Sequence, residues 1–421
     1  MNKTFNKLEF DVILDRLESY CFTDKAKKQC KDLTPYLSEI ELSVHLRDTT
    51  EARKILDEIG TPPLVSMKDL DKLLITANQG GLLFPDQIEY LGSILTACKR
   101  MIDFLNRCKR INVGLAYYVE NLDPMEDLRE EILRSIRNGK VDDYASNELR
   151  DIRRSILNLE SKIKDKAEGL LKSNKECYSD SFISNRNGHI CLPVKKEYKF
   201  RISGTVIDKS SSGSTLFIEP TAITNMTSEL SSLKLEEENE VRKILYTLTT
   251  LIADCSSRIE QNAGVIEKLD FIFAKGRLSA ELDAIPPTMN TKRYLYIKNG
   301  INPLMNKDTC VPLNIRIDKH RGIVITGPNT GGKTVAIKTV GLLSLMAQSG
   351  LHIPCEEADI CMNSQVLCDI GDGQNISENL STFSAHITNI LNILNNVDSD
   401  SLVILDELGS GTDPTRYMQI K

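Results

Sequence analysis

The sequence has no tryptophan, and aromatic residues make up only 5% of its 421 residues. It also lacks an apolar N-terminal signal region and any uninterrupted apolar run long enough to span a bilayer. Charged residues reach 27% with a net charge of −6, which argues against a uniformly basic coat for nucleic acid. These properties predict a cytoplasmic protein with long helices, no membrane partner and only local contacts with any polyanion.

Metal-binding cysteine pairs are also missing. Eleven cysteines are scattered from Cys21 to Cys368 without one C-x-x-C spacing. This pattern argues against metal cages and predicts buried, reduced thiols in a cytosolic protein.

What the sequence does contain is a complete G-x-x-x-x-G-K-T phosphate loop. Its residues are Gly327, Pro328, Asn329, Thr330, Gly331, Gly332, Lys333 and Thr334. Glycines let consecutive backbone N–H groups point at phosphate oxygens, while the lysine adds charge and the threonine hydroxyl reaches Mg²⁺. The apolar run 322–326 predicts a buried strand before the loop, and apolar spacing over Lys333–Gln348 predicts a helix after it. The pattern therefore predicts a nucleoside triphosphate site.

A second element further along the chain matches the first. Leu402–Leu405 is an apolar run that ends in Asp406 and Glu407. A buried parallel strand of this kind places its acids at the sheet edge where ligands bind. We expect Asp406 to hold Mg²⁺ with Thr334, and Glu407 to orient and deprotonate the attacking water.

Two heptad-like series predict long paired helices. One covers residues 149–163 and the other residues 241–255, behind the acidic run 236–238. Between them, short β-rich runs lie in residues 181–219. The sequence thus predicts an antiparallel arm with a small β tip.

The tip segment is basic within an acidic chain. Residues 186–209 contain six cations against two acids, Glu197 and Asp208, a net of +4. The six cations are Arg186, Lys195, Lys196, Lys199, Arg201 and Lys209. They are candidates for phosphate contacts with nucleic acid, although lysines that merely solvate and protect a small sheet would give the same composition.

In this order, the arm, tip and nucleotide site resemble the MutS family, and within it the bacterial branch called endonuclease MutS, type two, which lacks the mismatch-reading domain. The resemblance covers residues 1–414 and is densest in 327–334 (GPNTGGKT), 369–372 (DIGD), 380–386 (LSTFSAH) and 406–414 (DELGSGTDP). Upstream it includes 8–11 (LEFD), 186–188 (RNG), 192–195 (LPVK) and 216–220 (LFIEP).

The resemblance implies a mainly α fold with an α/β P-loop ATPase domain whose sheet is of the ABC type. It divides the chain into a helical core (1–125), an ascending coiled-coil arm (126–180), a β-rich clamp tip (181–222), a descending arm (223–285) and a partial ATPase domain (286–421). It implies ATP and Mg²⁺ as cofactors and a homodimer in which Ser381 reaches the γ-phosphate bound by the partner. His386 receives no chemical role, and Gly373 stands where the branch usually has an acid.

The implied function is an ATP-dependent clamp on branched DNA or on the ribosome and its rRNA. Such a clamp would act in suppression of recombination or in rescue of collided ribosomes. The alternative is a non-catalytic fragment that binds nucleic acid or a partner and has an incomplete ATPase site. A chromosome-organising ATPase would need much longer coils.

The chain ends fourteen residues after Glu407, whereas the resemblance implies further strands and a nuclease domain. We therefore expect no nuclease activity. We also expect residues 322–326 and Leu402–Leu405 to lack the strand that they share in such ATPases, so that the 421 residues alone bind and hydrolyse ATP poorly.

Overall fold

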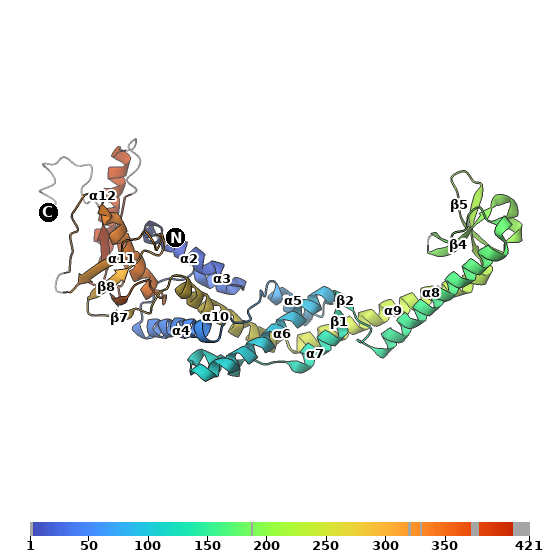
Figure 1. The fold of residues 1–421 in the computed structure, drawn as a ribbon, viewed down its shortest axis with the longest axis horizontal. Helices are drawn as coiled ribbons and strands as arrows, with labels where there is room; N and C mark the ends of the chain where they lie inside the picture. The colour runs from blue at the N-terminus through green and yellow to red at the C-terminus, as the bar shows by residue number, and fades with distance from the viewer. Residues whose placement is uncertain (1–2, 187, 319–320, 329–330, 372–378, 407–421) are drawn as a thin grey trace. The chain divides into compact units, whose positions relative to one another are not determined.

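The computed structural model describes residues 3–186, 188–318, 321–328, 331–371 and 379–406, with the side chains of 379–385 excepted. The chain forms two compact units (Figure 1). Unit 1 comprises Met1–Lys68, Ala97–Pro124 and Arg258–Lys421, and unit 2 comprises Asp69–Thr96 and Met125–Ser257. Among the described residues, no helix is both long and apolar enough to cross a bilayer.

The helices of unit 1 are set by caps and apolar spacing. They are α1 (Lys3–Lys7), α2 (Phe10–Ser19), α3 (Asp24–Lys31), α4 (Glu39–Glu58), the end of α6 (Pro85–Cys108), η1 (Lys109–Ile111), η2 (Gly114–Asn121), α10 (Ser256–Glu281), α11 (Lys333–Gln348) and α12 (Asn379–Asn396). Thr23 and Ser38 cap α3 and α4 by accepting hydrogen bonds from backbone N–H groups three residues on.

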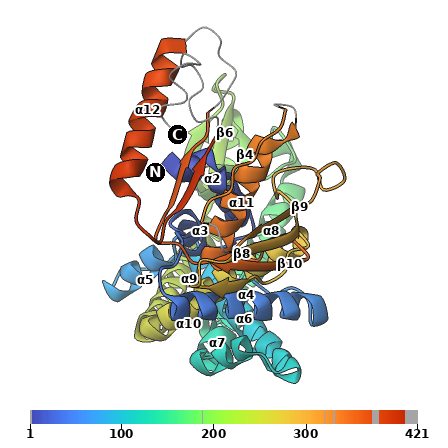
Figure 2. The same ribbon diagram turned by 90° about the vertical axis from the view of Figure 1, so that its left-hand side faces the viewer.

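Two sheets accompany these helices. The first has the order β7 (Thr288–Asn290), β10 (Glu357–Cys361), β8 (Leu295–Gly300), β9 (Leu313–Ile317), with β7 and β10 parallel and the other pairs antiparallel. The second is the parallel pair β11 (Val366–Asp369) and β12 (Leu402–Leu405). Figure 2 shows α12 beside this pair. The strand predicted at Leu402–Leu405 is confirmed, and so is the helix predicted at Lys333–Gln348.

The N-terminal helices share their core with the phosphate-loop helix. Leu8, Phe10 and Ile13 belong to the same buried cluster as Val340 of α11 and Ile404 of β12. The five-part division of the chain did not anticipate this packing, and its boundaries remain a prediction.

The strand predicted at residues 322–326 is wrong. The segment forms no regular secondary structure and pairs with no described strand, and Val324 is 88% exposed. β12 pairs with β11, so among the described strands none lies between β12 and this segment. Apolar composition alone does not make a strand when the chain offers no partner for its backbone groups.

Unit 2 contains two long helices that lie side by side (Figure 1). Its elements are α5 (Leu70–Asn78), the start of α6, α7 (Glu126–Ser135), β1 (Ile136–Arg137), β2 (Lys140–Val141), α8 (Asn147–Ser173), η3 (Lys175–Cys177) and α9 (Thr221–Asp254). Arg153 of α8 pairs with Glu237 of α9 at 2.7 Å, and Glu160 pairs with Lys234 at 2.9 Å. From the first pair to the second, the residue number rises on α8 and falls on α9, so the two helices are antiparallel.

An antiparallel sheet packs against the C-terminal part of α8 and the N-terminal part of α9. Its order is β3 (Ser184–Arg186), β4 (His189–Lys195), β6 (Thr215–Pro220), β5 (Gly204–Lys209), and the turn η4 (Lys196–Arg201) follows β4. Ile163 of α8 and Ile223 of α9 share a buried cluster with Leu192, Val194 and Ile218 of the sheet. We call this sheet with η4 the tip sheet.

Candidate functional site

The phosphate loop leads into α11. Gly332 precedes the helix with φ +76°, a left-handed conformation that favours glycine. The N–H of Gly331 donates to the carbonyl of Pro328 at 2.9 Å. A Cβ on Gly327 or Gly332 would meet nothing within 4 Å, so the loop is open at both glycines. The N-terminus of the sixteen-residue helix α11 has backbone N–H groups and a partial positive charge that favour anion binding, and the open glycines leave room for the anion.

Lys333 folds back over this loop. Its ammonium donates to the carbonyls of Gly327 at 2.6 Å and Pro328 at 2.9 Å. The positive charge thus lies where the loop backbone converges, and phosphate oxygens there would gain a charge-assisted partner. Asn329 and Thr330, also predicted to bind nucleotide, lie outside the described residues.

The two residues predicted to bind metal are in direct contact. The Thr334 hydroxyl donates to Oδ2 of Asp406 at 2.6 Å. Asp406 follows β12, and its backbone N–H donates to the Asp369 carbonyl at 2.8 Å, which extends the parallel pairing by one step. The first turn of α11 and the end of β12 therefore converge on one point, with a hydroxyl and a carboxylate that suit a hard cation such as Mg²⁺.

Asp369 forms a second polar cluster next to Asp406. Its carboxylate accepts from Lys7 at 3.1 Å and from Asn389 at 2.8 Å, and lies 3.0 Å from Nδ1 of His386. Burial raises the pKa of Asp369, but hydrogen bonds from His386, Asn389 and Lys7 outweigh it and hold the pKa below its usual value. The structure thus places His386, to which the sequence assigned no role, against the residue beside the predicted metal ligand.

The sequence contained one signal for this cluster. Asp369 ends the apolar run of β11 just as Asp406 follows that of β12, and parallel strands bring their carboxyl ends to one edge. No pattern in the sequence indicated that Lys7, 362 residues away, donates a hydrogen bond to Asp369.

Gly373 lies outside the described residues. Two further predicted site residues are not placed either: Glu407 lies outside the described residues, and Ser381 belongs to α12 without a described side chain. Their predicted roles stay predictions. The described donors fit a triphosphate with Mg²⁺: open loop amides, one lysine, one hydroxyl and one carboxylate.

The predicted basic residues of the tip sheet fall into two groups. Three have partners: Arg186 lies 3.8 Å from the Asp208 carboxylate, Arg201 donates to the Glu176 carboxylate at 2.8 Å, and Lys195 donates to the Glu176 carbonyl at 3.0 Å. The other three are Lys196, Lys199 and Lys209. Their side chains are exposed, and no carboxylate of the described residues is within ion-pair distance of them. Their full charge is therefore available to a polyanion.

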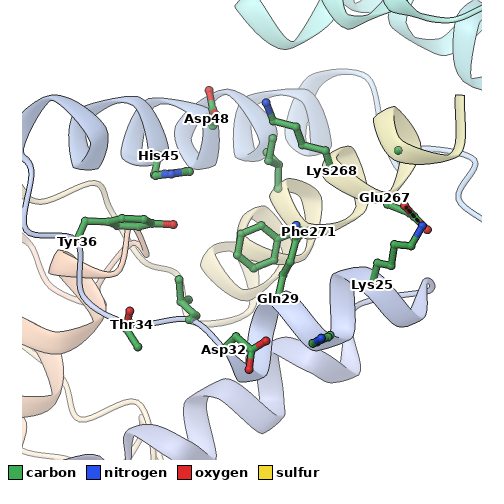
Figure 3. A pocket seen from close by; sticks show the side chains of 14 residues that line it. Lys25, Gln29, Asp32, Thr34, Tyr36, His45, Asp48, Glu267, Lys268 and Phe271 are labelled. Atoms are coloured by element: carbon green, nitrogen blue, oxygen red, sulfur yellow. Dashed lines mark ion pairs between the residues drawn. The ribbon is translucent and has the colours of Figure 1, made fainter. Parts of the chain in front are cut away.

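A hollow of about 740 Å³ lies elsewhere in unit 1 (Figure 3). Tyr36 and His45 stack in its wall with ring centroids 4.3 Å apart, and Lys25 pairs with Glu267 at 3.4 Å. Three lysines and three acids line it, and none of the described residues of the phosphate loop does. Its balanced charge is less suited to a triphosphate than the phosphate loop is.

The phosphate loop falls within a range of the chain that matches a known family model. Residues 323–420 match the family model described as MutS domain V. Over 98% of its length, the chain is 40% identical to "Endonuclease MutS2" of Clostridium botulinum (strain Alaska E43 / Type E3), covering 54% of that protein. Proteins of the same name from Alkaliphilus oremlandii (strain OhILAs) and Clostridioides difficile (strain 630) are each 39% identical over 98% of the chain, which covers 53% of each.

The fold and site define a P-loop protein with a long helical pair and a terminal sheet. The matches confirm the resemblance found in the sequence, and the chain belongs to the MutS family. It spans about half the length of the curated relatives it matches.

Proposed function

We propose that this chain binds and hydrolyses ATP with Mg²⁺ at the phosphate loop, and that the nucleotide state controls a clamp on nucleic acid. The contact between Thr334 and Asp406 carries this proposal, because it unites the two predicted metal ligands from separate elements. Membership of the MutS family supports it.

Each residue has a distinct part in the proposed reaction. Lys333 neutralises the β- and γ-phosphates, and Thr334 with Asp406 holds Mg²⁺, which supplies further charge neutralisation. Glu407 orients the attacking water and accepts its proton. Ser381 of a second copy completes the site, so that two ATPase heads dimerise around ATP.

The proposed clamp contacts nucleic acid through the tip sheet. The exposed lysines at 196, 199 and 209 support phosphate contacts, which read charge and not base sequence. Both branched DNA and ribosomal RNA fit such a surface, and with them roles in suppression of recombination or in rescue of collided ribosomes.

One observation favours a second candidate, a nucleic-acid-binding module with little ATPase activity. Residues 322–326, which lead into the loop, have no strand partner among the described residues. A phosphate loop without this support is less preorganised, which weakens both binding and turnover.

Two variants test the ATPase proposal. Lys333→Ala should abolish binding of a fluorescent ATP analogue, since the loop then lacks its cation. Glu407→Gln should retain binding and lose hydrolysis, because the amide cannot accept the proton from water.

Nucleotide binding and turnover, measured in the two variants and in the unmodified chain, also distinguish the two candidate functions. Equal loss of affinity in both variants would remove Glu407 as the base. Nucleotide binding without any turnover in the unmodified chain, measured by phosphate release, would favour the second candidate.

A further inference from the structure

The turn η4 of the tip sheet presents one aromatic ring to solvent. Phe200 is 95% exposed, the highest value among the large apolar side chains of the described residues. A single exposed apolar side chain is ordinary on a protein surface. The setting of this ring distinguishes it, because it belongs to the basic segment that reads Lys-Lys-Glu-Tyr-Lys-Phe-Arg over residues 195–201.

The other aromatic residue of the turn has a structural role. Tyr198 is half-buried and packs against the core of the tip sheet. Lys195 and Arg201 lie over its ring, at 5.9 and 5.4 Å from the ring centroid, and both also donate to Glu176. These contacts hold η4 in place, so Phe200 is carried by a fixed turn.

One cation lies close to Phe200, and another is exposed in the same turn. The ammonium of Lys199 lies 5.7 Å from the centroid of its ring, and the Lys196 side chain in the same turn is exposed. Glu197 is the one acid within 195–201. An exposed ring in a turn that also carries exposed cations is the arrangement that binds a nucleobase, since the ring stacks on the base while ammonium groups contact the flanking phosphates.

We propose that Phe200 stacks on an unpaired base, so that the clamp tip prefers nucleic acid with single-stranded or unstacked nucleotides over continuous duplex. In a duplex both faces of each base are already stacked, and only edges and phosphates are accessible. The ring gains a stacking partner where a base is free, at a junction, bulge, loop or single strand. The inference rests on the proposed binding of nucleic acid by the tip sheet.

The test compares affinities of the full chain for a short fluorescein-labelled single-stranded DNA of mixed sequence and for the blunt duplex made from it. Phe200→Ala should weaken single-strand binding by about five- to 150-fold, the range of base–aromatic stacking, and leave duplex binding unchanged. Phe200→Tyr should retain single-strand affinity because it keeps the ring. Since the side chain is exposed, all variants should keep the parent's circular dichroism and melting temperature.

Three results would overturn the inference. They are unchanged single-strand affinity in Phe200→Ala, an equal loss on both substrates, and full single-strand affinity in Phe200→Leu, which would indicate apolar docking without stacking. The double variant Lys196→Gln with Lys199→Gln tests the proposed function separately. This double variant should bind both the single strand and the duplex more weakly. If its affinity for both is unchanged, the tip sheet is not the binding surface. If the double variant loses affinity but Phe200→Ala does not, the tip sheet still binds nucleic acid and only the stacking is refuted.

Discussion

The hydroxyl of Thr334 donates to the carboxylate of Asp406 at 2.6 Å, although 72 residues separate them. Each residue comes from a different local pattern, the start of a helix and the end of a strand. Their contact means that one bound cation could take ligands from both, and several experiments can test the consequences.

Thr334→Val should lower Mg²⁺-dependent affinity for ATP by about 10- to 150-fold, since a contact to a charged partner is worth roughly 1.5–3 kcal/mol. Valine has nearly the same shape but lacks the hydroxyl. Thr334→Ser is the matched control and should retain affinity. Titration of a fluorescent ATP analogue with and without Mg²⁺ checks this, and equal Mg²⁺ dependence in the valine and serine variants would contradict it.

Residues 322–326 should exchange their amide hydrogens rapidly. They have no strand partner among the described residues, whereas β11 and β12 are paired over four residues each. Hydrogen–deuterium exchange with mass spectrometry should therefore show early labelling of a peptide over 322–328 and slow labelling of one over Val366–Asp369. Comparable protection of the two peptides would show that the apolar run is paired in solution.

Gly350→Ala should destabilise the protein by about 1–3 kcal/mol. Gly350 lies two residues beyond the end of α11 with φ +72°, and an added Cβ would lie 2.9 Å from Cβ of His45, an atom that cannot rotate away. Gly264→Ala is the control, because this site lies within α10, where a Cβ meets nothing within 4 Å. That change should be neutral or stabilising by up to about 1 kcal/mol. Urea unfolding followed by circular dichroism measures both, and equal midpoints would contradict the prediction.

Stability should fall between pH 6.5 and pH 4 because of His352. Burial, with the nearby charges of Arg53 and Lys275, lowers the pKa of His352 to about 4. Below pH 6.5 the unfolded chain takes up a proton that the folded state excludes, so unfolding becomes easier until both states are protonated below pH 4. The full effect is about 3 kcal/mol.

The variant His352→Gln tests whether His352 causes this loss of stability at low pH. The ring bridges the hydroxyls of Ser279 and Thr50 at 2.7 and 2.9 Å, and a glutamine amide can serve both without titrating. The variant should show a flatter dependence of unfolding free energy on pH over this window. An unchanged slope would assign the acid sensitivity to other groups.

Neutralising the three lysines of the tip sheet that have no carboxylate partner among the described residues should flatten the salt dependence of nucleic-acid binding. Glutamine at positions 196, 199 and 209 should reduce the slope of log affinity against log salt by up to about three units, since each phosphate contact contributes roughly 0.9. Lys195→Gln with Arg201→Gln should change the slope less, because both side chains already donate to Glu176. Equal slopes for the two sets, measured by fluorescence anisotropy, would contradict this division.

The sequence by itself determined the parts of this protein that depend on local pattern. Glycine positions and apolar spacing located the phosphate loop and α11, and an apolar run ending in an acid located β12 with Asp406. Periodicity of three and four indicated the long helices α8 and α9. Such features are legible because each depends on neighbours a few residues away.

Only the tertiary structure decided which distant groups meet. It brought Lys7 to Asp369 and, within the part of the chain that the structure describes, left residues 322–326 without a strand partner. It also divided the basic residues of the tip sheet into those held by Glu176 or Asp208 and those that no described carboxylate pairs with. Whether an apolar run becomes a strand, or a lysine keeps its charge available, depends on partners supplied by packing. Local composition specifies what a segment can do, and long-range contacts select which of those possibilities is realised.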